Sequence, residues 1–114
     1  MSQKFQWERD FSKEIENARY SREAGNEGRA RVSARRAAGI AAGVYLSQIM
    51  PDYKIKGALE NLSDLQSHPD IRDNIKELVN IFLIRVDYDH NLPIEADLIE
   101  QAINLKNLLL TPEE

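Results

Sequence analysis

Arg85 and His90 are the residues whose types and spacing come closest to those of a catalytic pair, with four residues between them. An unperturbed imidazole titrates at about pH 6.5, so His90 can serve as general acid or base toward a ribose 2′-hydroxyl. The forked guanidinium of Arg85 can hold the scissile phosphate and stabilise its developing charge. This chemistry would be metal-independent RNA cleavage.

A structural role for the same two residues stays open. Asp87 and Asp89 lie between them, and carboxylates without compensation repel an RNA backbone. In the structural alternative, Arg85 pairs with one of these aspartates and His90 caps a helix end.

A second candidate is an arginine-rich stretch. Residues 19–36 carry a net charge of +4, whereas the rest of the chain is acidic. Such asymmetry indicates a surface for nucleic acid or for an acidic protein. On a helix, Arg31 and Arg35 share one face, and Arg29 and Arg36 share another. The alternative is that these arginines pair with acids of neighbouring helices.

Gly39 and Gly43 form a small-residue motif that lets another helix approach closely. The motif fits either a homodimer seam or packing inside the bundle against the first or fourth helical segment. Packing inside the bundle is favoured because a central helix must be covered in any case.

Composition excludes several classes of site. The chain has no cysteine and only two histidines, without ligand spacing, so we expect no disulfide, metal site or cofactor. Tyr20 is the lone aromatic residue within the arginine-rich stretch, which argues against a base-stacking platform. The N-terminus has no signal-peptide core, and the longest apolar stretch, 37–46, is too short for a bilayer. We expect a soluble, cytoplasmic protein.

Apolar residues at helical spacing predict five helices in one domain spanning residues 1–114. The first ends near Gly25, a natural stop signal, and Asn26 is the expected N-cap of the second. The second runs to about Ile49 and lacks a charged face in its later part, so it is expected to be the central helix. The first three helices carry the stripes Trp7, Phe11, Ile15 and Ala18; Ala30, Ser33, Ala37, Ile40, Ala41, Val44 and Gln48; and Ile55, Leu59, Leu62 and Leu65.

The last two predicted helices follow polar turns. Leu92-Pro93 separates them, and proline suits the first turn of a helix. Their stripes are Ile71, Ile75, Leu78, Phe82 and Val86, and then Leu98, Ala102, Leu105 and Leu109. The links are short, so the predicted fold is all-α: a compact up-down bundle of four to five antiparallel helices.

The order of these signals resembles the HEPN family (higher eukaryote and prokaryote nucleotide-binding domains). The resemblance lies in an aromatic-bearing first helix ending at Ala24-Gly25, an alanine-rich second helix with Arg35-Arg36-Ala37-Ala38-Gly39-Ile40-Ala41, and a polar loop, Arg85-Val86-Asp87-Tyr88-Asp89-His90. Glu95-Ala96-Asp97-Leu98 then opens the last helix.

This resemblance implies a HEPN-like bundle that commonly dimerises. It also implies relatives that act in toxin–antitoxin pairs, in RNA cleavage or beside nucleotidyltransferase partners. Arg85 and His90 match the Arg-x(4–6)-His motif of the ribonuclease members, although Val86 stands where those members usually have a polar residue. The favoured hypothesis is a non-catalytic binding and assembly module, a homodimer that contacts a protein or a nucleic acid such as RNA. The alternative is a metal-independent endoribonuclease, the toxin of a pair, using Arg85 and His90.

Overall fold

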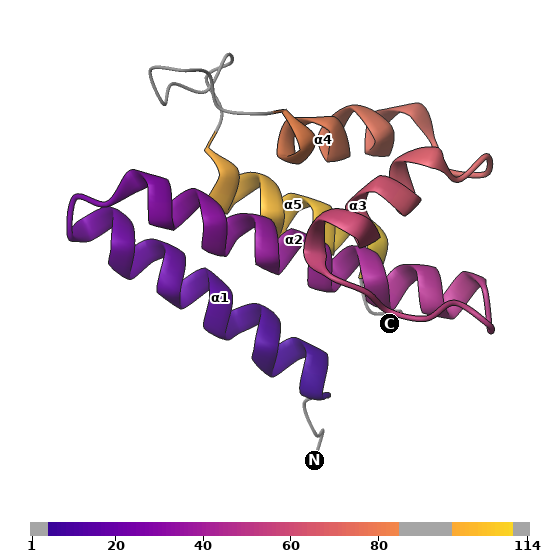
Figure 1. The fold of residues 1–114 in the computed structure, drawn as a ribbon, viewed down its shortest axis with the longest axis horizontal. Coiled ribbons are helices and arrows are strands. Elements are labelled where there is room, and N and C mark those ends of the chain that lie inside the picture. Colours follow the sequence, from indigo (N-terminus) through magenta and orange to yellow (C-terminus); the bar gives the residue numbers. More distant parts are fainter. Residues whose placement is uncertain (1–4, 85–96, 111–114) are drawn as a thin grey trace.

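The computed structural model describes residues 5–84 and 97–110, and every regular element in these ranges is an α-helix. The helices are α1 (Gln6–Glu23), α2 (Glu27–Ile49), α3 (Ala58–Ser67), α4 (Asp73–Leu83) and α5 (Leu98–Leu110). In Figure 1, α1 and α4 run in one direction and α2 and α5 in the other, while the shorter α3 links α2 to α4. The predicted all-α helical bundle is confirmed.

The helix α2 is central, as its small residues predicted, because it packs against α1, α3 and α5. Alanine and glycine on several of its sides let these neighbours approach closely. The helices α3, α4 and α5 supply larger side chains that fill the core. These fully buried side chains include Leu62, Leu65, Val79, Phe82, Leu98 and Leu105.

The connection between α1 and α2 is a tight turn made of local hydrogen bonds. Gly25 has a φ of +82°, a conformation in which a side chain would be strained. The amide of Gly25 donates to the Arg22 carbonyl, and the amide of Asn26 donates to the Ser21 carbonyl, which together form a Schellman motif. The Asn26 side chain then accepts from the amide of Arg29 at 3.0 Å. The predicted stop and N-cap are both confirmed.

The third and fourth helices are shorter than their apolar stripes predicted. Ile55 precedes α3, and both Ile55 and Leu59 are 57% exposed instead of buried. Ile71 is buried but precedes α4, which ends at Leu83, and Val86 lies outside the described residues. Gln48, the last residue of the stripe predicted for the second helix, is exposed.

Among the described residues, no helix combines the length and apolar character needed to cross a bilayer.

Candidate partner-binding groove

The predicted catalytic residues Arg85 and His90 lie outside the described residues. The first of the two described ranges ends just before them, at Ile84. Ile84 lines a surface groove. Because this groove adjoins the predicted catalytic residues in the chain, we describe its lining as the candidate site.

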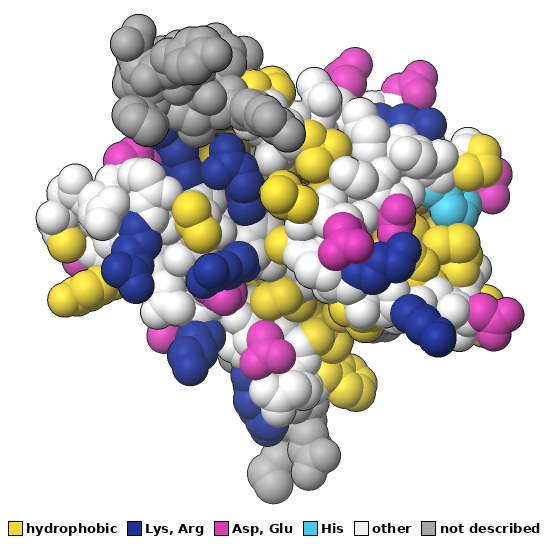
Figure 2. Space-filling model, in the orientation of Figure 1, with side chains coloured by type: hydrophobic (Ala, Val, Ile, Leu, Met, Phe, Trp, Pro, Cys, Tyr) yellow, Lys and Arg dark blue, Asp and Glu magenta, His cyan; other side chains and the backbone are white. Residues whose placement is uncertain are grey.

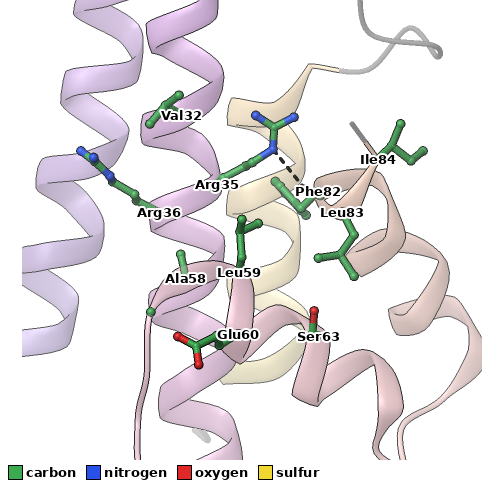
Figure 3. Close-up of a pocket in the computed structure, with 11 residues that line it drawn as sticks. Val32, Arg35, Arg36, Ala58, Leu59, Glu60, Ser63, Phe82, Leu83 and Ile84 are labelled. Carbon is green, nitrogen blue, oxygen red and sulfur yellow. Dashed lines mark hydrogen bonds between the residues drawn. The ribbon is translucent and has the colours of Figure 1, made fainter. Parts of the chain in front are cut away.

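The groove lies where α2, the first turn of α3 and the end of α4 meet (Figure 3), and it has a volume of about 810 Å³. We call it the α2–α3–α4 groove. Most of the described lining residues are apolar, and they stand beside two arginines and one glutamate. The lining residues are Val32, Arg35, Arg36, Gly57, Ala58, Leu59, Glu60, Ser63, Phe82, Leu83 and Ile84.

Arg35 forms the wall of the groove between α2 and α4. Its Nε donates a hydrogen bond to the Phe82 carbonyl at 3.0 Å (Figure 3). That carbonyl belongs to the last turn of α4, where carbonyls lack helical partners and carry partial negative charge. Burial, with a smaller contribution from Arg31, lowers the pKa of the Arg35 guanidinium. Arg35 is therefore a cap on α4 contributed by a distant helix, and it brings its positive charge to the groove.

The exposed side chains of the groove include Arg36, Glu60, Ser63 and two aliphatic residues. Val32, on α2, is 45% exposed, and Leu59, on α3, is 57% exposed. Arg36 makes no ion pair with any described residue within 4.0 Å, and it also lines an adjoining groove beside Trp7. An apolar surface with a cation at its edge is thus open to solvent.

The remaining arginines divide between paired and exposed. Arg22 contacts the carboxylates of Glu27 and Asp97, each at 2.9 Å, and we call this group the Arg22 clip. Arg31 lies 3.9 Å from Glu27. Arg29 is exposed. In the view of Figure 2, basic side chains gather over the half of the molecule formed by α1 and the start of α2. Within the arginine-rich stretch, Arg22 and Arg31 therefore pair with acidic residues of the chain. Arg29 and Arg36 remain available to a partner.

The Arg22 clip ties the end of α1 to the starts of α2 and α5. The hydrogen bond between Arg22 and Glu27 is the main cause of both pKa changes. It lowers the pKa of Glu27 and raises the pKa of Arg22. At Asp97 partial burial raises the pKa, but hydrogen bonds from Arg22 and from the amides of Glu100 and Ile99 outweigh it and leave the pKa lowered. Asp97 is therefore both N-cap of α5 and partner of Arg22.

The glycine pair Gly39 and Gly43 lies within the bundle, against α3. A Cβ on Gly39 would stand 2.4 Å from the Cα of Ala58, and one on Gly43 would stand 2.7 Å from the side-chain nitrogen of Asn61. The close approach predicted for these glycines is thus made inside the chain, but the partner is α3, not the first or fourth helix. Both glycines are buried.

Sequence analysis missed the polar network beside these glycines. Asn61 is 2% exposed, and its Nδ2 donates to the carbonyls of Gly39 and Lys56. Its Oδ1 accepts from the Lys56 amide and the Tyr53 hydroxyl, each at 2.9 Å. The single proton of the Tyr53 hydroxyl is shared between Asn61 Oδ1 and Asp64, and burial, followed by the bond to Asp64, raises the Tyr53 pKa. The available signal was an asparagine beside Leu62 in an apolar stripe, since a buried amide needs partners.

The described residues contain no cluster of His, Cys, Asp and Glu able to hold a metal ion. Comparison with family models, with curated proteins and with solved structures gave no match to this chain. What the groove binds is therefore inferred from its own side chains.

Proposed function

We propose that this protein is a non-catalytic, HEPN-like binding and assembly module of the cytoplasm that dimerises and receives an anionic partner in the α2–α3–α4 groove. The observation that carries the proposal is the lining of that groove. Val32 and Leu59 are exposed apolar residues, and Arg36 stands beside them without a carboxylate partner among the described residues.

The groove also meets the general requirements of a recognition site. Recognition sites are concave and largely apolar, with a few polar groups that set orientation. Here Arg35 is held in place by its bond to the Phe82 carbonyl, so its position is fixed before a partner arrives. A preorganised cation loses less freedom on binding than a mobile one.

The test is a titration of isotope-labelled protein with two anionic probes, a polyglutamate peptide and a single-stranded oligouridylate. We expect amide shifts to cluster at Val32, Arg36 and Leu59 with at least one probe, and Arg36→Glu to remove them. Shifts spread evenly over exposed arginines such as Arg9, or unchanged shifts in Arg36→Glu, would contradict a specific groove. Sedimentation of the unlabelled protein tests the dimer.

The alternative function is a metal-independent endoribonuclease that uses Arg85 and His90. It is favoured by one observation: Ile84 lines the groove and Arg85 follows it directly in the chain. Its test is RNA cleavage by purified protein in excess chelator, beside Arg85→Ala and His90→Ala. Cleavage that disappears in both variants would establish this alternative and replace the non-catalytic proposal. Equal cleavage by wild type and both variants would reject it.

A further inference from the structure

We propose that the occupant of the α2–α3–α4 groove is an acidic amphipathic helix of a partner protein. This inference rests on the proposed function and names the class of partner. It follows from the secondary structure of the groove walls, from the type of apolar side chain exposed there, and from the sign of the charge at the edge.

The walls favour a helix over an extended peptide. Each described wall is a helix or a helix end, from α2, α3 and α4, and no strand is present among the described residues. A strand-like peptide gains affinity by adding main-chain hydrogen bonds to a free sheet edge, which these walls do not supply. A helix satisfies its own main chain and presents side chains alone to such a groove.

The exposed lining selects aliphatic side chains. Val32 and Leu59 stand open to solvent, and Leu83 and Ile84 are half-buried beside them. Among the described lining residues, the lone aromatic is Phe82, which is 1% exposed and cannot offer its ring face to a nucleotide base. Binding of single-stranded RNA relies on stacking of bases on exposed aromatic rings. Leucine or isoleucine at every third or fourth position of a partner helix fits this surface better.

The charge at the groove selects acidic flanking residues. Arg36 is exposed, and Arg35 keeps its terminal nitrogens directed away from Phe82 (Figure 3). Glu60 is the one acidic residue among the described lining. Figure 3 shows Glu60 on the far side of Leu59 from Arg35. Carboxylates of a partner helix can therefore meet two guanidinium groups without facing a like charge directly.

The experiment is selection of a phage-displayed library of random peptides, each about 16 residues or four helical turns long, on the folded protein. Selected peptides are then synthesised, and their affinities are measured by fluorescence anisotropy. We expect them to combine Asp or Glu with aliphatic residues at spacings of three and four. Enriched peptides that are basic, or peptides without helical spacing, would overturn the proposal.

Paired variants locate the binding. Arg36→Glu and Leu59→Glu should each weaken the selected peptides by about tenfold or more, because one reverses the charge and the other buries a carboxylate. The matched controls are Arg9→Glu and Leu108→Glu, which change an exposed arginine and an exposed leucine away from the groove. These should stay within about twofold of wild type. Equal losses in variants and controls would place the binding elsewhere.

The oligouridylate separates failure of this inference from failure of the proposed function. If it binds at Arg36 while no peptide is enriched, the groove binds an anion and the partner-helix proposal is wrong. If neither oligouridylate nor any peptide binds, both proposals are wrong. Thermal unfolding of each variant confirms that lost binding does not reflect lost folding.

Discussion

One face of the helix α2, which carries positions 32, 36, 39 and 43, has an open side toward the start of the helix and a closed side toward its end. On the closed side, Gly39 and Gly43 let α3 rest against the backbone, and every side-chain polar group of Asn61 has a partner within the chain. On the open side, Val32 and Arg36 face solvent at the groove. We therefore expect substitutions on the closed side to alter the stability of the fold, and substitutions on the open side to alter the binding of a partner.

The largest effect is expected at Gly39. The variant Gly39→Ala would place a methyl group 2.4 Å from the backbone of Ala58, so α3 must move. We expect a loss of about 3 kcal/mol in the free energy of unfolding, because overpacking outweighs the gain in helix propensity. Urea denaturation measures the loss. The control is Gly28→Ala, where the nearest contact is 3.8 Å away and stability should hold. Equal stability of both variants would mean that α2 and α3 do not pack this closely.

Asn61→Ala should have the next largest effect. On the closed side, the change leaves the Lys56 amide without its acceptor and removes the bond to the Gly39 carbonyl, while the Tyr53 hydroxyl keeps Asp64. We expect a loss of about 2 kcal/mol, because buried donors without partners carry their full desolvation penalty. Asn107→Ala, an exposed change on α5, is the matched control. A cost no greater than that of the control would show that water replaces the network.

The Arg22 clip should make stability depend on acid. The pKa values of Glu27 and Asp97 are lowered in the folded chain, so the clip stabilises the fold above the ordinary carboxyl range and is lost as pH falls through the folded values. Both carboxylates are more than a third exposed, so each pair should contribute only about 0.5 kcal/mol.

The measurement for the clip is thermal unfolding from neutral pH down to the acidic range, in wild type and in Arg22→Met. We expect the variant to lose less stability than wild type as pH falls, and high salt to narrow the difference. Parallel pH profiles in the two proteins would show that these ion pairs add nothing to the stability of the fold.

The smallest effect on stability is expected on the open side. Arg36→Glu removes no ion pair with a described residue, so its free energy of unfolding should stay within about 0.5 kcal/mol of wild type. Urea denaturation beside Gly39→Ala makes the comparison direct. A large loss in Arg36→Glu would mean that this arginine supports the fold, and the contrast between the two sides of α2 would then fail.

Much of the helical framework could be predicted because its signals are local. The stop at Gly25 and the cap at Asn26 depend on neighbours within a few residues, and both are as expected. The apolar stripe of α5 is buried at every predicted position, Leu98, Ala102, Leu105 and Leu109. Apolar spacing predicts the buried residues of α5 correctly because its apolar face packs against the rest of the bundle along its whole length.

The remaining features depend on residues far apart in the sequence. The end of α4 is capped by Arg35, which lies 47 residues before Phe82, and no local pattern contains that bond. Leu59 continues an apolar stripe but lines an open groove, since spacing identifies a face without saying what covers it. For the same reason the spacing of Gly39 and Gly43 indicated a close approach but could not identify α3 as the helix that makes it.

The tight turn at Gly25 also bears on the order in which the chain folds. It joins two long helices by a very short loop, so bringing α1 against α2 costs little loop-closure entropy. Docking of α5 on α2 must close a far longer loop. We therefore expect α1 and α2 to form an early hairpin and α5 to join late, as contacts close in sequence form fastest. Pulsed hydrogen exchange during refolding would reveal this as amide protection that reaches α1 and α2 before α5.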